Sequence, residues 1–157
     1  MQNLVNFSDA VSLAFHAVGV MAVEPEKYYR TKEIADMLQV SEHHLQKVHQ
    51  RLAKMGFIRA VRGPKGGYAL NRPPQGIPLL DVFEAIEGPL NPNQCLLGKP
   101  KCQKADCALG KMVDHVNAIV KEHLGNLTAQ DLASSAFGQT PLNIGEDNER
   151  GMADLAE

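Results

Sequence analysis

Two short helical patterns, separated by two residues and followed by a glycine-rich hairpin, constrain the fold of this chain more than any other feature. The first pattern covers residues 32–38 and the second covers residues 41–54, with Gln39 and Val40 between them. Two helices joined this closely form a helix-turn-helix, in which the second helix can enter the major groove of DNA. The spacing therefore predicts a head that reads nucleic acid.

Both helical patterns are amphipathic. In the second helix, the stripe that we expect to be buried contains Leu45, Val48, Leu52 and Met55. The opposite face is polar or basic and contains His43, His44, Lys47, Gln50, Arg51 and Lys54. Any amphipathic helix has a polar face, so the prediction depends mainly on the spacing between the two helices.

Capping residues mark where the two helices begin. We expect Thr31 to cap the first helix and Ser41 to cap the second. The histidines 43, 44 and 49 could suggest a metal site, but no two of them are four residues apart. We therefore expect all three to face solvent or DNA.

A glycine-rich turn joins two short strand-like runs after the second helix. The runs cover residues 57–62 and 68–70, with Gly63-Pro64-Lys65-Gly66-Gly67 between them. Glycine permits the positive backbone angles that hairpin turns need. A basic hairpin behind a helix-turn-helix is a wing, which can reach phosphates or a narrow minor groove. A nucleotide phosphate loop is excluded, because Tyr68 follows Gly67 where that loop requires lysine.

The charge of the chain is distributed unevenly. Residues 27–72 carry ten Lys or Arg and three Asp or Glu, although the whole chain has a net charge of −2. One basic stretch in an otherwise acidic chain is typical of a polyanion site, and a solvated lysine-rich face is the alternative. We predict DNA contacts at Ser41, His43, His44, Lys47, Gln50, Arg51, Arg62, Lys65 and Tyr68.

The sequence predicts a mainly α fold with a small β wing, in four parts. These are a winged helix-turn-helix domain at 1–72, a linker helix and cysteine loop at 73–107, a dimerisation helix with a short C-terminal helix at 108–136, and a disordered acidic tail at 137–157. Three prolines between positions 72 and 78 interrupt the first junction. Apolar residues 79–86 then predict a short buried helix, which Gly88 and Pro89 end.

The long helix of the third part has an apolar stripe over about five turns. It contains Leu109, Met112, Val113, Val116, Ile119, Val120, Leu124 and Leu127. A small domain has little left to cover such a helix, so we expect it to pair with its copy in a homodimer. Packing across its own head is the alternative. Thr128 is expected to cap a last helix at 129–136.

The three cysteines of the chain, Cys95, Cys102 and Cys107, lie within thirteen positions. Thiolates this close favour a soft metal. Zinc usually takes C-x2-4-C pairs, which are absent here, whereas iron–sulfur clusters accept looser spacing. Free or redox-active thiols, or one disulfide, are the alternatives. An odd cysteine count favours a reducing compartment, and the apolar residues 10–23 are interpreted as a core helix rather than a membrane or export segment. We expect a cytoplasmic protein.

The chain resembles the winged-helix iron–sulfur transcription regulators of bacteria, the family of IscR and NsrR, over about residues 1–133. The resemblance is carried by residues 7–9, 34–41, 45–48, 61–68 and 81–88 and by the three cysteines, with Arg62-Gly-Pro and Gly66-Gly67-Tyr68 the most specific. It implies a homodimer with a crossed pair of long helices on a two-fold double-stranded DNA operator. It also implies a [2Fe-2S] or [4Fe-4S] cluster on three cysteines and one further ligand.

The fourth ligand differs among members of that family. IscR-like members place a histidine three residues after the last cysteine, where this chain has Gly110. NsrR-like members use an aspartate near the start of the chain, donated by the partner subunit, and Asp9 occupies the matching place. The resemblance therefore implies Asp9 as the ligand. A plain acid at a helix N-terminus is the alternative for Asp9, and His16, His115 or solvent could then complete the site.

These observations predict a transcription regulator, expected to be a repressor, whose cluster senses nitric oxide, redox state or iron–sulfur status. A cluster-free regulator controlled by thiol oxidation or a partner protein is the second hypothesis. An iron–sulfur carrier is the third, although a carrier would not need the basic head. The sequence has no nucleophile–base pair and no cofactor fingerprint, so we do not expect an enzyme.

Overall fold

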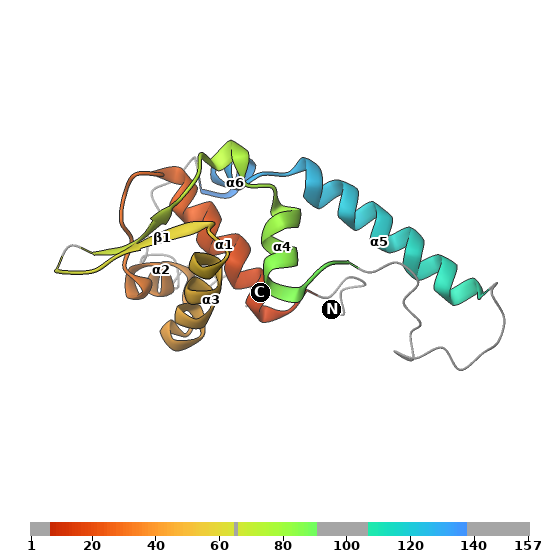
Figure 1. The fold of residues 1–157 in the computed structure, drawn as a ribbon, viewed down its shortest axis with the longest axis horizontal. Coiled ribbons are helices and arrows are strands. Elements are labelled where there is room, and N and C mark those ends of the chain that lie inside the picture. The colour runs from red at the N-terminus through yellow and green to blue at the C-terminus, as the bar shows by residue number, and fades with distance from the viewer. Residues whose placement is uncertain (1–6, 65, 91–106, 138–157) are drawn as a thin grey trace, which may run out of the picture.

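The computed structural model of the chain describes residues 7–64, 66–90 and 107–137. In this part of the chain the fold is mainly α-helical with one two-stranded sheet, as predicted (Figure 1). The elements in chain order are α1 (Asp9–Val23), α2 (Thr31–Leu38), α3 (Glu42–Lys54), β1 (Ile58–Val61), β2 (Gly67–Leu70), the 3-10 turn η1 (Pro74–Gly76), α4 (Leu79–Glu87), α5 (Ala108–Asn126), α6 (Ala129–Leu132) and the π-helical turn η2 (Ala133–Phe137).

Helix α1 is the centre of the core. Its Val11, Ala14, Val18 and Met21 are completely buried, and the helix packs against α3, α4 and α6. An apolar helix buried on most of its surface needs no polar face, which explains why residues 10–23 contain so few polar side chains. Burial of each large side chain contributes about 1.5–3 kcal/mol to folding. The prediction of a first core helix is confirmed.

The helix-turn-helix forms as predicted from α2 and α3. Gln39 ends α2 in the left-handed conformation, with φ of 53°, and its backbone N–H bonds to the carbonyls of Ala35 and Asp36. Ser41 caps α3 by accepting a hydrogen bond from the His44 amide at 3.4 Å. The cap predicted for α2 is wrong, because Arg30 occupies that position and makes no side-chain cap. Thr31 instead begins the helix and turns its hydroxyl toward α3.

The wing is an antiparallel pair in which Ile58 lies opposite Leu70 and Val61 lies opposite Gly67. Backbone atoms press closely on its glycines. A Cβ at Gly66 would lie 2.1 Å from the Val61 carbonyl oxygen, and one at Gly67 would lie 2.5 Å from that of Tyr29. Only glycine fits at these two positions, so the turn chemistry and the docking of the wing on Tyr29 depend on them.

Helices α4 and α5 are joined through the ends that face the core. The Leu79 amide donates to the Leu127 carbonyl at 2.8 Å, and the Ala129 amide donates to the Ile77 carbonyl at 3.0 Å. Thr128 and Asp131 form a complete capping box at the start of α6. The predicted cap is therefore confirmed, but α6 ends at Leu132 and continues as the π turn η2, since the predicted 129–136 helix changes its winding.

Helix α5 extends away from the head, with its C-terminal end at the core and its N-terminal end far from it (Figure 1). Of its side chains only Leu124 is buried. Four large apolar residues stay exposed at the helix or just after it, namely Leu109 (55%), Met112 (52%), Ile119 (44%) and Leu127 (43%). Packing across its own head, the alternative considered above, is thus limited to the C-terminal end of the helix.

None of the helices in the described part of the chain combines the length and the apolar character that crossing a bilayer requires. The predicted disordered tail lies, from residue 138 onward, outside the described residues.

Candidate nucleic-acid interface and cysteine segment

The exposed face of α3 carries most of the predicted DNA contacts. His43, Lys47 and Gln50 are exposed, Ser41 is exposed at the cap, and His44 is partly exposed. On the other side, Leu45, Val48 and Leu52 are buried as predicted. Met55 is 50% exposed, so its assignment to the buried stripe was wrong. Met55 is the C-cap that follows Lys54, the last residue of α3, so it lies at the end of the helix and not within the buried stripe.

His49 does not face solvent or DNA, contrary to the expectation from sequence. Its side chain is completely buried on the inner face of α3, and its ring lies 4.7 Å from the ring of Tyr68, centre to centre. The phase of the helix already contained this information, because residue 49 lies one turn from both Leu45 and Leu52. The expectation that His49 would be exposed came from the polar character of histidine.

A partly buried polar network joins α2, α3 and the wing around His49. The Thr31 hydroxyl donates to Gln46 Oε1 at 2.8 Å, and Gln46 Nε2 donates to the Tyr68 hydroxyl at 3.2 Å. His49 Nδ1 lies 3.2 Å from the Thr31 oxygen. Since the Thr31 proton is directed at Gln46, Nδ1 carries the proton of this pair and donates it. Nε2 is then a bare acceptor, and it is buried without a hydrogen-bond partner among the described residues.

Burial lowers the pKa of His49 from 6.5 to about 4. A charged imidazole at this position would lose its hydration and gain no anionic partner. The residue is consequently neutral at physiological pH and serves packing between the two helices and the wing. Sequence reasoning missed the whole network, because Thr31, Gln46 and Tyr68 are far apart in the chain and follow no common period.

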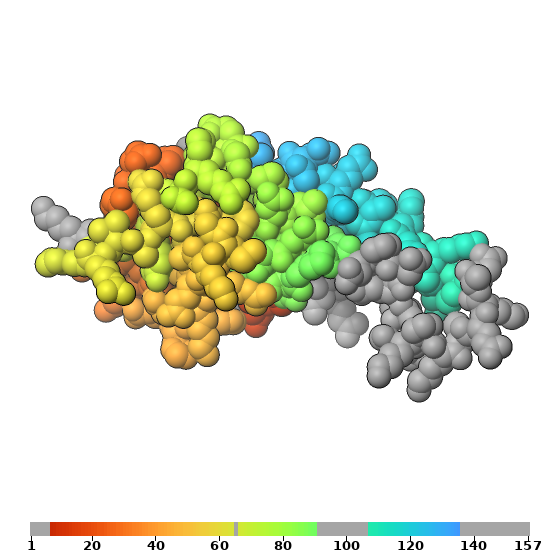
Figure 2. Space-filling view, in the orientation of Figure 1, coloured from red at the N-terminus to blue at the C-terminus, as the bar shows by residue number. Residues whose placement is uncertain are grey.

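The wing presents Arg62 to solvent at the end of β1. Arg59 on the same strand is held by the protein, with Nε 3.2 Å from the Tyr28 hydroxyl and Nη2 3.1 Å from Glu26 Oε2. Arg30 reaches the turn and donates to the Pro64 carbonyl. Lys65 lies outside the described residues. Figure 2 shows α3 and the wing as neighbouring parts of one surface at the end of the molecule opposite the free end of α5.

Two predicted contact residues bond within the head instead of standing free. Tyr68 is half-buried in the network with Gln46 and His49. Arg51 is exposed on one side, but its Nε donates to the Ala85 carbonyl of α4 at 2.9 Å. Neither bond was predicted from sequence, because each depends on how elements distant in the chain pack.

Of the predicted ligand residues, Cys107 and Asp9 lie within the described part of the chain. Cys107 is a free, half-buried thiol at the N-cap position of α5, and Asp9 is exposed in the first turn of α1. Cys95 and Cys102 lie outside the described residues. Within residues 7–64, 66–90 and 107–137, no three metal-ligating side chains gather. The structure therefore brings Asp9 and Cys107 of one chain to different elements and does not join them.

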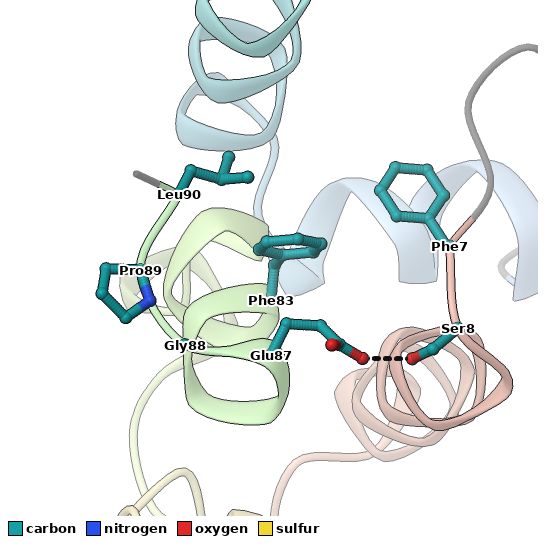
Figure 3. Close-up of a pocket in the computed structure, with 7 residues that line it drawn as sticks. All are labelled: Phe7, Ser8, Phe83, Glu87, Gly88, Pro89 and Leu90. Atoms are coloured by element: carbon teal, nitrogen blue, oxygen red, sulfur yellow. Dashed lines mark hydrogen bonds between the residues drawn. The ribbon is translucent and has the colours of Figure 1, made fainter. Parts of the chain in front are cut away.

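A small cavity of about 410 Å³ lies where α1 and α4 meet (Figure 3). Phe7 and Ser8 line one side of it, and Phe83 and Glu87 line the other. The Phe7 ring meets the Phe83 ring edge-on at 6.0 Å, and the Ser8 hydroxyl donates to the Glu87 carboxylate. These contacts hold the residues just before Asp9 against the C-terminal end of α4.

Comparison with known families gives one match over most of the chain. Residues 7–135 match the Rrf2 family, which is described as an iron-dependent transcriptional regulator. The match includes the helix-turn-helix, the wing, α4, α5 and all three cysteines.

Individual relatives carry three different names. CymR of Bacillus subtilis is 32% identical over 108 residues, which cover 69% of this chain and 74% of CymR. Its solved structure, titled as the global cysteine regulator of that organism, aligns with a TM-score of 0.70 at 26% identity, covering 83% of this chain and 98% of CymR. NsrR of Bacillus licheniformis is 31% identical over 64% of this chain and 72% of NsrR. The structure of T. potens IscR aligns with a TM-score of 0.69 at 27% identity over 88% of this chain and 93% of IscR.

Proposed function

The chain belongs to the Rrf2 family of helix-turn-helix transcriptional regulators, which are not enzymes, and we propose that it binds a two-fold operator as a homodimer under the control of an iron–sulfur cluster. The observation that carries the proposal is the separation of two surfaces. A polar and basic face on α3 and the wing stands at one end, and Cys107 stands at the free N-terminal end of α5 at the other.

The DNA-reading part of the proposal rests on exposed side chains. His43, Lys47 and Gln50 of α3 are free to meet base edges and phosphates in a major groove. Arg62 on the wing is free to enter the adjacent minor groove. Ser41 and His44 stand at the start of α3, where the backbone amides favour a phosphate. Lys65 would extend the basic surface of the wing.

The dimer part rests on α5. Soluble chains rarely leave a long apolar stripe in water, and the exposed Leu109, Met112 and Ile119 form such a stripe on one face of the helix. Pairing with the same helix of a second copy would remove all of them from solvent, since a two-fold interface uses the same patch twice.

The cluster part rests on the donor set. Thiolates are the ligands that iron–sulfur clusters take, and Cys107 is a free thiol that remains partly accessible. It stands at the N-cap position of α5. Cys95 and Cys102 would supply the other two thiolates. A bound cluster would supply reactivity toward nitric oxide and oxidants, and the carboxylate of Asp9 would offer a labile fourth contact.

Asp9 would have to come from the other subunit. It stands on α1 in the head, whereas α5 carries Cys107 away from the head of its own chain. A shared site would therefore link the cysteine segment of one subunit to the head of its partner. His16 and His115 are both exposed and are the alternatives for this contact.

A cluster-free regulator controlled by thiol oxidation is the second candidate. The observation that favours it is that Cys107 is a free thiol and only half-buried, so an oxidant can reach its sulfur. The similarity to CymR, titled a cysteine regulator, points the same way.

One purification distinguishes the two candidates. Protein prepared without oxygen should show visible absorption and contain iron and acid-labile sulfide. Each of the variants Cys95→Ala, Cys102→Ala and Cys107→Ala should lose the absorption, the iron and the sulfide. Operator affinity should differ between the loaded protein and the same protein after cluster removal. A colourless, iron-free protein whose DNA affinity changes on thiol oxidation would establish the second candidate instead.

A further inference from the structure

Helix α4 lies between α5 and the recognition helix α3 (Figure 1). It packs against α1, α3 and α5 at once (Figure 1). Its first residue is bonded to the end of α5 through Leu79 and Leu127. Its last residue, Glu87, is followed within a few positions by the segment that contains Cys95. A displacement of either end of α4 would therefore act directly on the helices that α4 contacts.

The end of α4 is also attached to the start of α1. The Ser8 hydroxyl donates to Glu87 while it accepts from the Val11 amide at 3.2 Å, so one side chain both caps α1 and holds α4 (Figure 3). The edge-on contact of Phe7 with Phe83 reinforces the junction. These contacts hold the start of α1, next to Asp9, against the C-terminal end of α4. We call them the Ser8–Glu87 joint.

Arg51, on the recognition helix α3, bonds to the same end of α4. Its Nε donates to the Ala85 carbonyl at 2.9 Å. Ala85 lies among the last four residues of α4, whose carbonyls have no partner inside the helix. A cation at this end also suits the helix dipole. Both effects draw the guanidinium toward α4.

The position of Arg51 on α3 agrees with this role. At about 100° per residue, Lys47 and Gln50 stand opposite the buried face of Leu45 and Leu52, whereas Arg51 stands roughly a third of a turn from that face. It thus belongs to the flank of the helix that meets α4.

We infer that Arg51 is a positioning residue, which holds α3 on the C-terminal turn of α4 and passes the state of the cysteine segment to the recognition helix. This role replaces the DNA contact expected from sequence. The inference rests on the proposed cluster control. When the cysteine segment and the Ser8–Glu87 joint shift, α4 moves, and Arg51 moves α3 with it.

The experiment compares two substitutions on the same helix. The full-length protein is prepared in the loaded form and after cluster removal, and each form is titrated with the duplex that loaded wild-type protein selects from a random-sequence library. Titrations over a range of salt concentrations give the slope of log affinity against log salt. The variants are Arg51→Met and, as the matched control one turn earlier, Lys47→Met. Glu87→Ala tests the far end of the joint, away from α3, and also serves if Arg51→Met does not fold.

Arg51→Met is expected to keep the wild-type salt slope while the ratio of affinities between the two forms falls by at least about threefold. Lys47→Met should keep that ratio and lower the slope by about 0.9, the loss of one phosphate contact. Glu87→Ala should behave like Arg51→Met.

Two results would overturn the inference in different ways. A lower slope with an unchanged ratio in Arg51→Met, together with an unchanged ratio in Glu87→Ala, would make Arg51 an ordinary phosphate contact. Equal affinities of the two wild-type forms would remove the proposed cluster control itself, and this inference would fall with it.

Discussion

The Thr31 hydroxyl oxygen and Nδ1 of His49 lie 3.2 Å apart at the buried junction of α2 and α3. This contact satisfies one nitrogen of the imidazole and leaves the other, Nε2, without a partner in the part of the chain that the structure describes. The pair joins the two helices of the head at the cost of a buried, unpaired acceptor. A proton on that acceptor would place a charge in the core, which makes the head sensitive to acid.

Stability is predicted to fall as the pH drops from 6.5 to about 4. Burial lowers the pKa of His49 from 6.5 to about 4, so the unfolded chain binds this proton first as the pH falls. The contribution of the neutral, buried His49 to the free energy of unfolding is fully present above pH 6.5 and is lost as the pH approaches the folded pKa. The complete loss is on the order of 3 kcal/mol. Urea unfolding followed by circular dichroism at several pH values measures it.

Two substitutions on α3 separate this effect from general acid unfolding. His49→Leu should remove the pH dependence in this window and, at pH 7, should be as stable as wild type or more stable by up to about 1 kcal/mol, because it deletes the unpaired acceptor. His43→Leu removes an exposed histidine from the same helix and should keep the wild-type pH dependence. If His49→Leu and wild type follow the same pH curve, the neutral buried state of His49 is incorrect.

A second prediction concerns the wing. Arg62→Ala is expected to weaken operator binding by about 1–3 kcal/mol, since Arg62 is free to make a specific groove contact. Arg59→Ala is the matched control on the same strand, where Glu26 and Tyr28 already engage the guanidinium. It should cost less than about 0.5 kcal/mol of operator affinity. Fluorescence anisotropy with a labelled duplex at fixed salt measures both, and equal losses would contradict the assignment of Arg62.

The fold was accessible from sequence where local rules decide it. The Ser41 cap, the spacing of α2 and α3, the glycine hairpin and the Thr128 cap each depend on a few neighbouring residues, and all of them form as predicted. The exposed stripe of α5 was also visible, because a period of 3.6 residues persists over five turns.

The features that could not be predicted from the sequence depend on contacts between elements that are distant in the chain. Residue type suggested that His49 was exposed, although its helical phase placed it in the core. The bond from Arg51 to the Ala85 carbonyl was not predicted, because it depends on how α3 packs against α4. The Ser8–Glu87 pair joins residues 79 positions apart, and no local pattern indicates such a bond.

A third prediction tests the dimer. Introducing glutamate at both Val116 and Ile119 places two charges in the centre of the apolar stripe of α5 and should give monomers that no longer bind a palindromic site. Ala118→Glu with Lys121→Glu adds glutamates to other faces of the same helix and should leave the dimer intact. Sedimentation velocity measures the mass of each. A dimer that persists in the Val116/Ile119 variant would mean that another surface joins the subunits.

The last prediction concerns Asp9. Asp9→Ala should retain the three-thiolate site but change the visible spectrum and the rate of reaction with nitric oxide, because the labile carboxylate contact is lost. Loss of an acid from the first turn of α1 should by itself cost only about 0.3–1 kcal/mol of stability.

Asp81→Ala controls for that helix-dipole effect, since Asp81 is the first-turn acid of α4. It should lower stability by a similar amount and leave the spectrum unchanged. If both variants keep the wild-type spectrum and response, Asp9 is only a helix N-terminal acid, and His16→Ala and His115→Ala become the variants to measure. If only Asp9→Ala alters them, the first turn of α1, joined through Ser8 to Glu87, carries the fourth contact of the cluster and links it to the DNA-reading head.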